Sequence, residues 1–283
     1  MIVIARLTVR ELVRRRVVWV LIGLSIVSVV LVGWGLERLV TLARADGVEE
    51  LGIRIGVSQV LILIAFMFSF VLAMTAAFVG APAIGGDLES GIALAMLARP
   101  IRRAEVLVGR WIGCAVVIVA YTILSGLLAI AIAFVVSDYG PPDPFLAVAF
   151  LAGQALVLLT LTLALGSVLP SIAAGAIAVV GFGLGWMAGV MAGVATVLGV
   201  ELLGRVAEVS RWILPSDGLW RGVVYGLEPP LVLLLAAGRA SNVAEANPFY
   251  ASSPPALVFV VWSVVWVCLV LGVAGWWFER RDL

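Results

Sequence analysis

Residues 146–200 read LAVAFLAGQALVLLTLTLALGSVLPSIAAGAIAVVGFGLGWMAGVMAGVATVLGV and contain no charged residue. A membrane-spanning helix needs about 20 apolar residues, and a single helix of this whole run would far exceed the thickness of a bilayer. Leu169-Pro170-Ser171 lies near the middle of the run, and proline cannot donate a helical hydrogen bond. We therefore predict a turn at Pro170 and two spans, residues 146–168 and 175–200.

The rest of the chain holds four more apolar stretches of spanning length, residues 17–36, 55–84, 111–136 and 255–278. The protein is 64% hydrophobic and only 12% charged, whereas soluble domains carry about 25% charged residues. A water-soluble fold could not hide so much apolar surface. We predict an all-α integral membrane protein, one transmembrane domain over residues 1–283 with six transmembrane helices.

Two absent residue types exclude several functions. Every basic residue is an arginine, and the chain has neither Lys nor His. Without Lys a P-loop cannot be completed, and without His the commonest general base and metal ligand is missing. We predict no catalytic residue and no metal site in this chain. Cys114 and Cys268 lie in apolar runs, and we expect both to be buried small hydrophobic residues.

The predicted spans themselves contain no Asp, Glu, Lys, Arg or His. Proton relays, ion-coupled carriers and voltage sensors place such residues inside the membrane, so their absence argues against a proton-driven carrier. It also argues against an intramembrane protease, which needs a base or a catalytic dyad there. If the protein moves a substrate, the energy must enter from outside the membrane.

Arginines mark one side of the membrane, because cytoplasmic flanks are enriched in basic residues. With six spans, the arginine-rich segments before the first span, between the second and third, and after the sixth all fall on one side. The loop at residues 137–145 has Asp138 and Asp143 and no arginine. We therefore predict that both termini are cytoplasmic.

Two stretches outside the spans have helical amphipathic spacing. In residues 2–16, apolar side chains at i, i+3, i+4 spacing oppose a ladder of Arg6, Arg10 and Arg14, which indicates a helix on the membrane surface; a plain basic anchor is the alternative. Residues 201–213 show the same pattern on the other side of the membrane. We predict that residues 201–253 form a partly ordered external cap.

Glycines at four-residue spacing form one stripe in the fifth span, and such a stripe lets another helix approach closely. We expect packing within the subunit, and a dimer contact or a sliding helix are the alternatives. The stripe consists of Gly181, Gly185, Gly189 and Gly193.

The loop between spans two and three, residues 85–110, combines both charge signs with a short apolar stretch and a proline. Acidic residues precede the apolar stretch and favour a helix N-terminus there, and Arg102 and Glu105 are spaced to pair on a second short helix. This pattern is typical of a docking knob; a solvated loop or a lipid-facing surface helix are the alternatives. The candidate contact residues are Asp87, Glu89, Gly91, Arg99, Pro100, Arg102, Arg103 and Glu105.

This loop resembles that of the permease subunits of ABC-2-type transporters, especially the NosY-like group. The similar elements are Glu89 and Gly91, the turn Ala98-Arg99-Pro100-Ile101-Arg102-Arg103, and Gly109-Arg110 before the third span. The ending Arg280-Arg281-Asp282-Leu283 and the external Leu214-Pro215-Ser216-Asp217-Gly218-Leu219-Trp220 are similar to the family as well.

The resemblance implies a permease without its own ATPase site, paired with a second permease subunit and with separate ABC ATPase subunits that bind ATP and Mg²⁺. Residues 1–16 would be the elbow helix and residues 85–110 the coupling helix. The family implies export of a hydrophobic or amphipathic substrate across a prokaryotic inner membrane. A non-transporting scaffold is the alternative. Polar and aromatic residues that could line a path include Gln59, Phe66, Phe70 and Thr75.

Overall fold

The structure, a computed structural model, describes residues 1–14, 16–89, 102–230, 232 and 247–280. In these residues the regular elements are all helices. They are α1 (Ile2–Arg14), α2 (Arg16–Ala45), α3 (Glu50–Glu89), α5 (Arg103–Ser137), α6 (Pro144–Gly166), α7 (Ser171–Leu198), α8 (Glu201–Ile213), α9 (Ser216–Leu227) and α12 (Leu257–Arg280). Six of them, α2, α3, α5, α6, α7 and α12, are long and apolar enough to cross a membrane, which confirms the six predicted spans.

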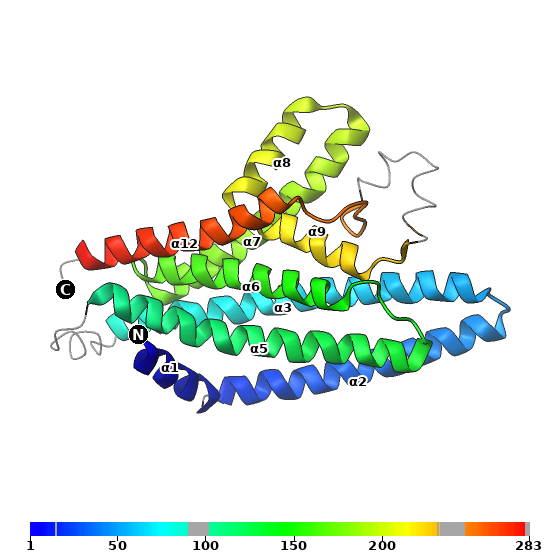
Figure 1. The fold of residues 1–283 in the computed structure, drawn as a ribbon, viewed down its shortest axis with the longest axis horizontal. Coiled ribbons are helices and arrows are strands. Elements are labelled where there is room, and N and C mark those ends of the chain that lie inside the picture. Colours follow the sequence, from blue (N-terminus) through cyan, green and yellow to red (C-terminus); the bar gives the residue numbers. More distant parts are fainter. Residues whose placement is uncertain (15, 90–101, 231, 233–246, 281–283) are drawn as a thin grey trace.

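The long helices form a lengthwise bundle (Figure 1), in which α6 packs against α3, α5, α7 and α12. The helix α1 and the end of α12 are both at the same end of the bundle, which we call the near end. The connections from α2 to α3 and from α5 to α6 lie at the opposite, far end. The helix α7 leaves the bundle obliquely and pairs with α8, so that this pair stands out from one side of the bundle.

The helix α6 is the centre of the bundle, because small and aliphatic side chains cover it on all sides. Leu159 and Leu163 are fully buried. The buried hydroxyls of Thr160 and Thr162 donate to backbone carbonyls one turn back, each at 2.7 Å, which satisfies them without water. Trp111 of α5 donates to the Thr160 hydroxyl at 2.9 Å. The threonine hydroxyls of this central helix are therefore bonded within the protein.

The predicted turn at Pro170 is confirmed: α6 ends at Gly166, α7 begins at Ser171, and Pro170 is the residue that caps α7. The helix α3 passes this turn at very close range. A side chain at Gly85 would meet the Ser171 hydroxyl at 2.7 Å and the Gly166 carbonyl at 3.3 Å. The turn therefore packs directly against the near end of α3.

The helices α2 and α3 extend well beyond the predicted spans. The helix α3 has 40 residues instead of the 30-residue apolar stretch 55–84, and α2 continues to Ala45, past residue 36. A hydropathy boundary marks where lipid ends, while a helix continues until its backbone turns. Here the turn comes at Gly47, which adopts a φ of 72°, a conformation that favours glycine.

The described part of the predicted external cap, residues 201–253, includes the helices α8 and α9, which differ in character. The predicted amphipathic stretch 201–213 is the helix α8. The helix α9 is short but buried along most of its length, and it packs against α6. Gly218, Gly222 and Gly226 permit this contact, since side chains there would overlap the Phe259 ring, the Phe150 ring and the backbone at Asp143 and Ala147, respectively. The α9 part of the expected cap thus belongs to the core.

One prediction about the cysteines is wrong. Cys114 is buried as expected, but Cys268 is exposed on the surface of α12. The reason is that an apolar run in a membrane protein has two apolar surroundings, protein and lipid, and a helix at the edge of a bundle turns one face to each. Cys268 lies on the lipid side.

Candidate functional site

The near end is held together by α1, which packs against the first turns of α5. A side chain at Gly109 would overlap Ile4, and one at Gly113 would overlap Thr8 and the Ala5 carbonyl. Ala5, Thr8 and Leu12 of α1 are accordingly buried. Ile2 and Leu7 of the same helix are exposed. The predicted amphipathic helix therefore packs one side against α5 and leaves apolar side chains exposed on another.

Two polar contacts tie the near end across the bundle. The guanidinium of Arg110 in α5 lies 2.6 Å from the Glu11 carboxylate of α1, and the Arg110 side chain is only 11% exposed. Arg103, in the first turn of α5, donates to the backbone carbonyl of Phe278 in α12 at 3.3 Å. The start of α5 is thus anchored to both terminal helices.

Five of the eight predicted docking residues lie at the end of α3 or at the start of α5. Asp87 and Glu89 are in the last turn of α3, Arg102 precedes α5, and Arg103 and Glu105 are in its first turn. Gly91, Arg99 and Pro100 lie outside the described residues. The structure therefore brings the two edges of the predicted knob to the near end.

The expected second short helix with an Arg102–Glu105 pair needs correction. Glu105 is in the first turn of α5 itself, which runs without interruption to Ser137. Arg102 has an extended backbone, and its carbonyl accepts the Glu105 backbone N–H at 3.0 Å. Among the described residues no ion pair joins the two side chains, because Arg102 stands outside the helix and its side chain does not share the helical face of Glu105.

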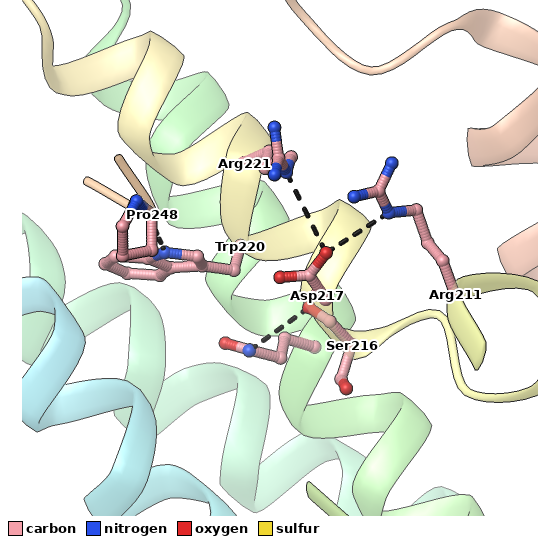
Figure 2. Close-up of polar contacts among 7 residues, drawn as sticks. Arg211, Ser216, Asp217, Trp220, Arg221 and Pro248 are labelled. Carbon is pink, nitrogen blue, oxygen red and sulfur yellow. Dashed lines mark hydrogen bonds and ion pairs between the residues drawn. The ribbon is translucent and has the colours of Figure 1, made fainter. Parts of the chain in front are cut away.

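The α8–α9 junction is organised around a buried carboxylate, Asp217 in the first turn of α9 (Figure 2). Arg211 donates to it at 3.1 Å, and Arg221 lies 3.8 Å from the same oxygen. The Asp217 side chain is 6% exposed. Burial raises the pKa of this carboxyl, and the two guanidinium groups oppose that shift. The Arg211–Asp217 pair holds α8 against α9, and the Arg221–Asp217 pair lies within α9.

Side-chain hydrogen bonds to backbone carbonyls fix the position of α9 along its neighbours (Figure 2). Gln154 of α6 donates to the Ser216 carbonyl at 3.2 Å, and the Trp220 indole donates to the Pro248 carbonyl at 2.9 Å. Two indoles of α12 do the same for α8: Trp262 donates to the Trp212 carbonyl at 2.9 Å and Trp266 to the Ile213 carbonyl at 2.7 Å. The carbonyls at the α8–α9 junction are therefore held by three long-range side-chain donors.

The glycine stripe of α7 faces this junction. Gly185, Gly189 and Gly193 are buried. A side chain at Gly189 would overlap the Asp217 carboxylate, and one at Gly185 would lie 3.1 Å from the Ser216 hydroxyl. At Gly181 an added carbon would make only ordinary contacts, at 3.8 Å from Leu161 and 3.9 Å from Leu214. The stripe thus makes room for the start of α9 within the same subunit.

The residues considered for a substrate path are separated in the structure. Phe66 packs into an aromatic cluster with Trp186, Trp220 and Phe249, at ring-centroid distances of 5.0, 5.6 and 5.4 Å. Phe70 is 46% exposed and touches Phe182. The Thr75 hydroxyl donates to the Val71 carbonyl of its own helix, and Gln59 is half-buried. Both residues belong to α3 but lie in other turns of it than Phe66 and Phe70.

A second buried carboxylate, Glu228, terminates α9 and had no counterpart in the sequence prediction. It is 1% exposed, and one of its oxygens accepts the Ala251 backbone N–H at 3.2 Å. Burial raises its pKa to about 7, opposed by that hydrogen bond. Tyr139, after α5, donates to the adjacent Leu227 carbonyl at 2.7 Å, and burial together with the Glu228 charge raises the tyrosine pKa. The sequence Glu228-Pro229-Pro230 does indicate the end of a helix, because proline cannot continue one, but it does not indicate that the carboxyl is buried.

Comparison with known proteins agrees with this architecture. The family described as ABC-2 family transporter protein matches residues 2–283, nearly the entire chain. No curated protein matches significantly.

Proposed function

The chain belongs to the ABC-2 family of transporter proteins, and from that premise we propose that it is the permease subunit of an ATP-driven exporter, coupled to its ATPase at the near end. The family is a transmembrane component that implies an ABC ATPase partner. ATP and Mg²⁺ would bind in that partner, because this chain has no Lys to complete a P-loop. A second permease subunit would complete the complex.

The observation that carries the proposal is the anchoring of the near end. The start of α5 is bonded to α1 through Arg110 and to α12 through Arg103, and it flanks the predicted docking knob. A displacement applied between α3 and α5 would therefore be transmitted to four helices at once. Such a connected arrangement suits a site where a soluble motor acts on the membrane helices.

The proposed orientation places the near end in the cytoplasm of a prokaryotic cell and the α8–α9 cap outside. The arginines of α1, the arginines around the start of α5 and Arg280 all belong to near-end segments, in keeping with the enrichment of basic residues on the cytoplasmic side. The transported compound would be hydrophobic or amphipathic, and the loop motifs resemble those of the NosY-like group.

The test is co-purification of the tagged permease with the ABC ATPase expressed beside it, together with ATP hydrolysis by the complex in nanodiscs. Glu89→Arg and Arg102→Glu should each reduce co-purification at least tenfold, because like charges brought together at an interface cost several kcal/mol. Arg205→Glu is the matched control, since this arginine lies on α8 and is 72% exposed. Full retention of ATPase binding and hydrolysis in both near-end variants would contradict the proposal and favour a scaffold.

A further inference from the structure

A large apolar cavity lies in the far half of the bundle, away from both the near end and the Asp217 cluster. It has a volume of about 430 Å³ and lies between α2, α3, α5 and α6, with Leu227 of α9 at its edge. Protein interiors are close-packed, and voids larger than a water molecule are few. Ligand pockets, by contrast, commonly measure about 300–1,000 Å³. The space is partly open at the outer surface of the bundle, so a molecule in the surrounding membrane can enter it.

The cavity exists because small residues line it where large ones would close it. Ser25 of α2, Ala65 of α3, and Gly126 and Ala129 of α5 all border the space. At Gly126 even one added carbon would come within 3.0 Å of Val148 in α6, so α5 and α6 already touch on that side. The lining residues that are at least half exposed, Leu31, Leu63 and Met67, belong to α2 and α3, so the space opens between these two helices.

The walls select the chemistry of the occupant. Almost all lining side chains are aliphatic or aromatic, and the rim residues Leu31, Leu63 and Met67 are each at least half exposed on the membrane-facing surface. The hydroxyl groups at the wall belong to Ser25, Ser28, Tyr121 and Ser125. Lipid is the surrounding solvent at this depth, and the remaining, apolar wall suits a hydrocarbon chain.

The length of the cavity along the bundle fits a single hydrocarbon chain. One end is marked by the hydrogen bond between the Ser25 and Tyr121 hydroxyls, 2.6 Å long, near the middle of α2 and α5. The other end lies by Ala147 and Leu227, at the far end of the membrane-spanning region. The lining part of α5, residues 121–130, covers about 13 Å at 1.5 Å per residue. That is close to half of a hydrocarbon core about 30 Å thick.

We propose that this cavity binds one acyl chain of a membrane phospholipid, which enters between α2 and α3 from the leaflet at the far end. In the orientation proposed above this is the outer leaflet, and only the naming of the leaflet rests on the proposed function. The site is separate from the Phe66 cluster, because Phe66 packs toward α7 and α9, whereas Ala65 and Phe68 of the same helix line the cavity.

The experiment uses the full chain in nanodiscs that contain a phosphatidylcholine with a photoreactive diazirine near the end of one acyl chain. After irradiation, mass spectrometry locates the adducts. We expect adducts concentrated on cavity residues such as Met67 and Tyr121. Ala129→Phe fills the cavity and should reduce these adducts at least fivefold. Ala131→Phe is the control, since Ala131 is exposed on the same helix two residues away and does not line the cavity.

Ser28→Phe, at the rim, provides a second filling variant in case Ala129→Phe does not fold, as judged by thermal unfolding. Labelling that stays equal in the filling and control variants, or that is spread evenly over lipid-facing residues, would overturn the proposal. In proteoliposomes with the probe in one leaflet only, labelling should come from the leaflet at the far end; equal labelling from both would also overturn it. Loss of ATPase coupling leaves these outcomes unchanged, so the two proposals fail separately.

Discussion

Replacement of Glu228 by Gln should make the protein more stable at neutral and alkaline pH. The carboxyl of Glu228 is 1% exposed, and its second oxygen, Oε1, has no hydrogen-bond partner in the described part of the chain. Gln has the same shape, carries no charge and keeps an oxygen to accept the Ala251 N–H. The substitution therefore removes a buried charge and leaves the hydrogen bond in place.

The magnitude follows from the pKa. Burial raises the pKa of Glu228 from an ordinary 4.5 to about 7, so the folded protein holds this proton more tightly than the unfolded chain does. The free energy of unfolding must then fall as the pH rises from about 4.5 to about 7, and stay at the lower value above that range. At 1.36 kcal/mol for each pH unit, the loss amounts to about 3 kcal/mol.

The assay is unfolding in detergent micelles, followed by tryptophan fluorescence between pH 5 and pH 8. Glu228→Gln should raise the free energy of unfolding by about 3 kcal/mol at pH 8 and change it little at pH 5. Glu201→Gln is the control, because that side chain is 80% exposed. Parallel pH curves for Glu228→Gln and the parent protein would refute the reasoning and show that the carboxylate is solvated.

Two further predictions concern contacts at opposite ends of the bundle. Gly189→Leu should destabilise the subunit by about 3 kcal/mol or more, because the new side chain overlaps the Asp217 carboxylate; Gly183→Leu, with nothing within 4 Å, should be near neutral, and equal melting temperatures would contradict the assigned packing. Glu11→Gln should cost about 1–3 kcal/mol, since it leaves the mostly buried Arg110 without its carboxylate. In an Arg110→Met background the same change should cost less than about 0.5 kcal/mol, and equal costs in both backgrounds would argue against the pair.

The membrane topology could be predicted from sequence because lipid imposes one simple condition on every span. A helix in hydrocarbon must be apolar along about 20 residues, and this length is visible in each of the six runs. The break at Pro170 could be predicted for an equally local reason, the missing N–H of proline. These features need no knowledge of which helices are neighbours.

The burial of α9 could not be predicted in the same way. Gly218, Gly222 and Gly226 repeat the four-residue spacing that identified the stripe of α7, but Asp217 and Arg221 make the segment too polar to be read as a span. Protein, not lipid, covers it: Phe150 and Phe259 lie against its glycines. Hydropathy measures transfer into lipid and carries no information about such partners, which come from helices about 70 and 40 residues away in the chain.

The length of α3 has a mechanical consequence. Its 40 residues make a rod about 60 Å long, roughly twice the hydrocarbon thickness. A pivot of about 5° around the middle of such a rod displaces each tip by about 3 Å. Pro82, which lies inside the helix, has no N–H to donate to the Phe78 carbonyl one turn earlier. The rod is therefore a lever with a long arm, residues 50–81, and a short arm, residues 82–89, and the stiffness of the helix at Pro82 decides how much of a push at the short arm arrives at the distant tip.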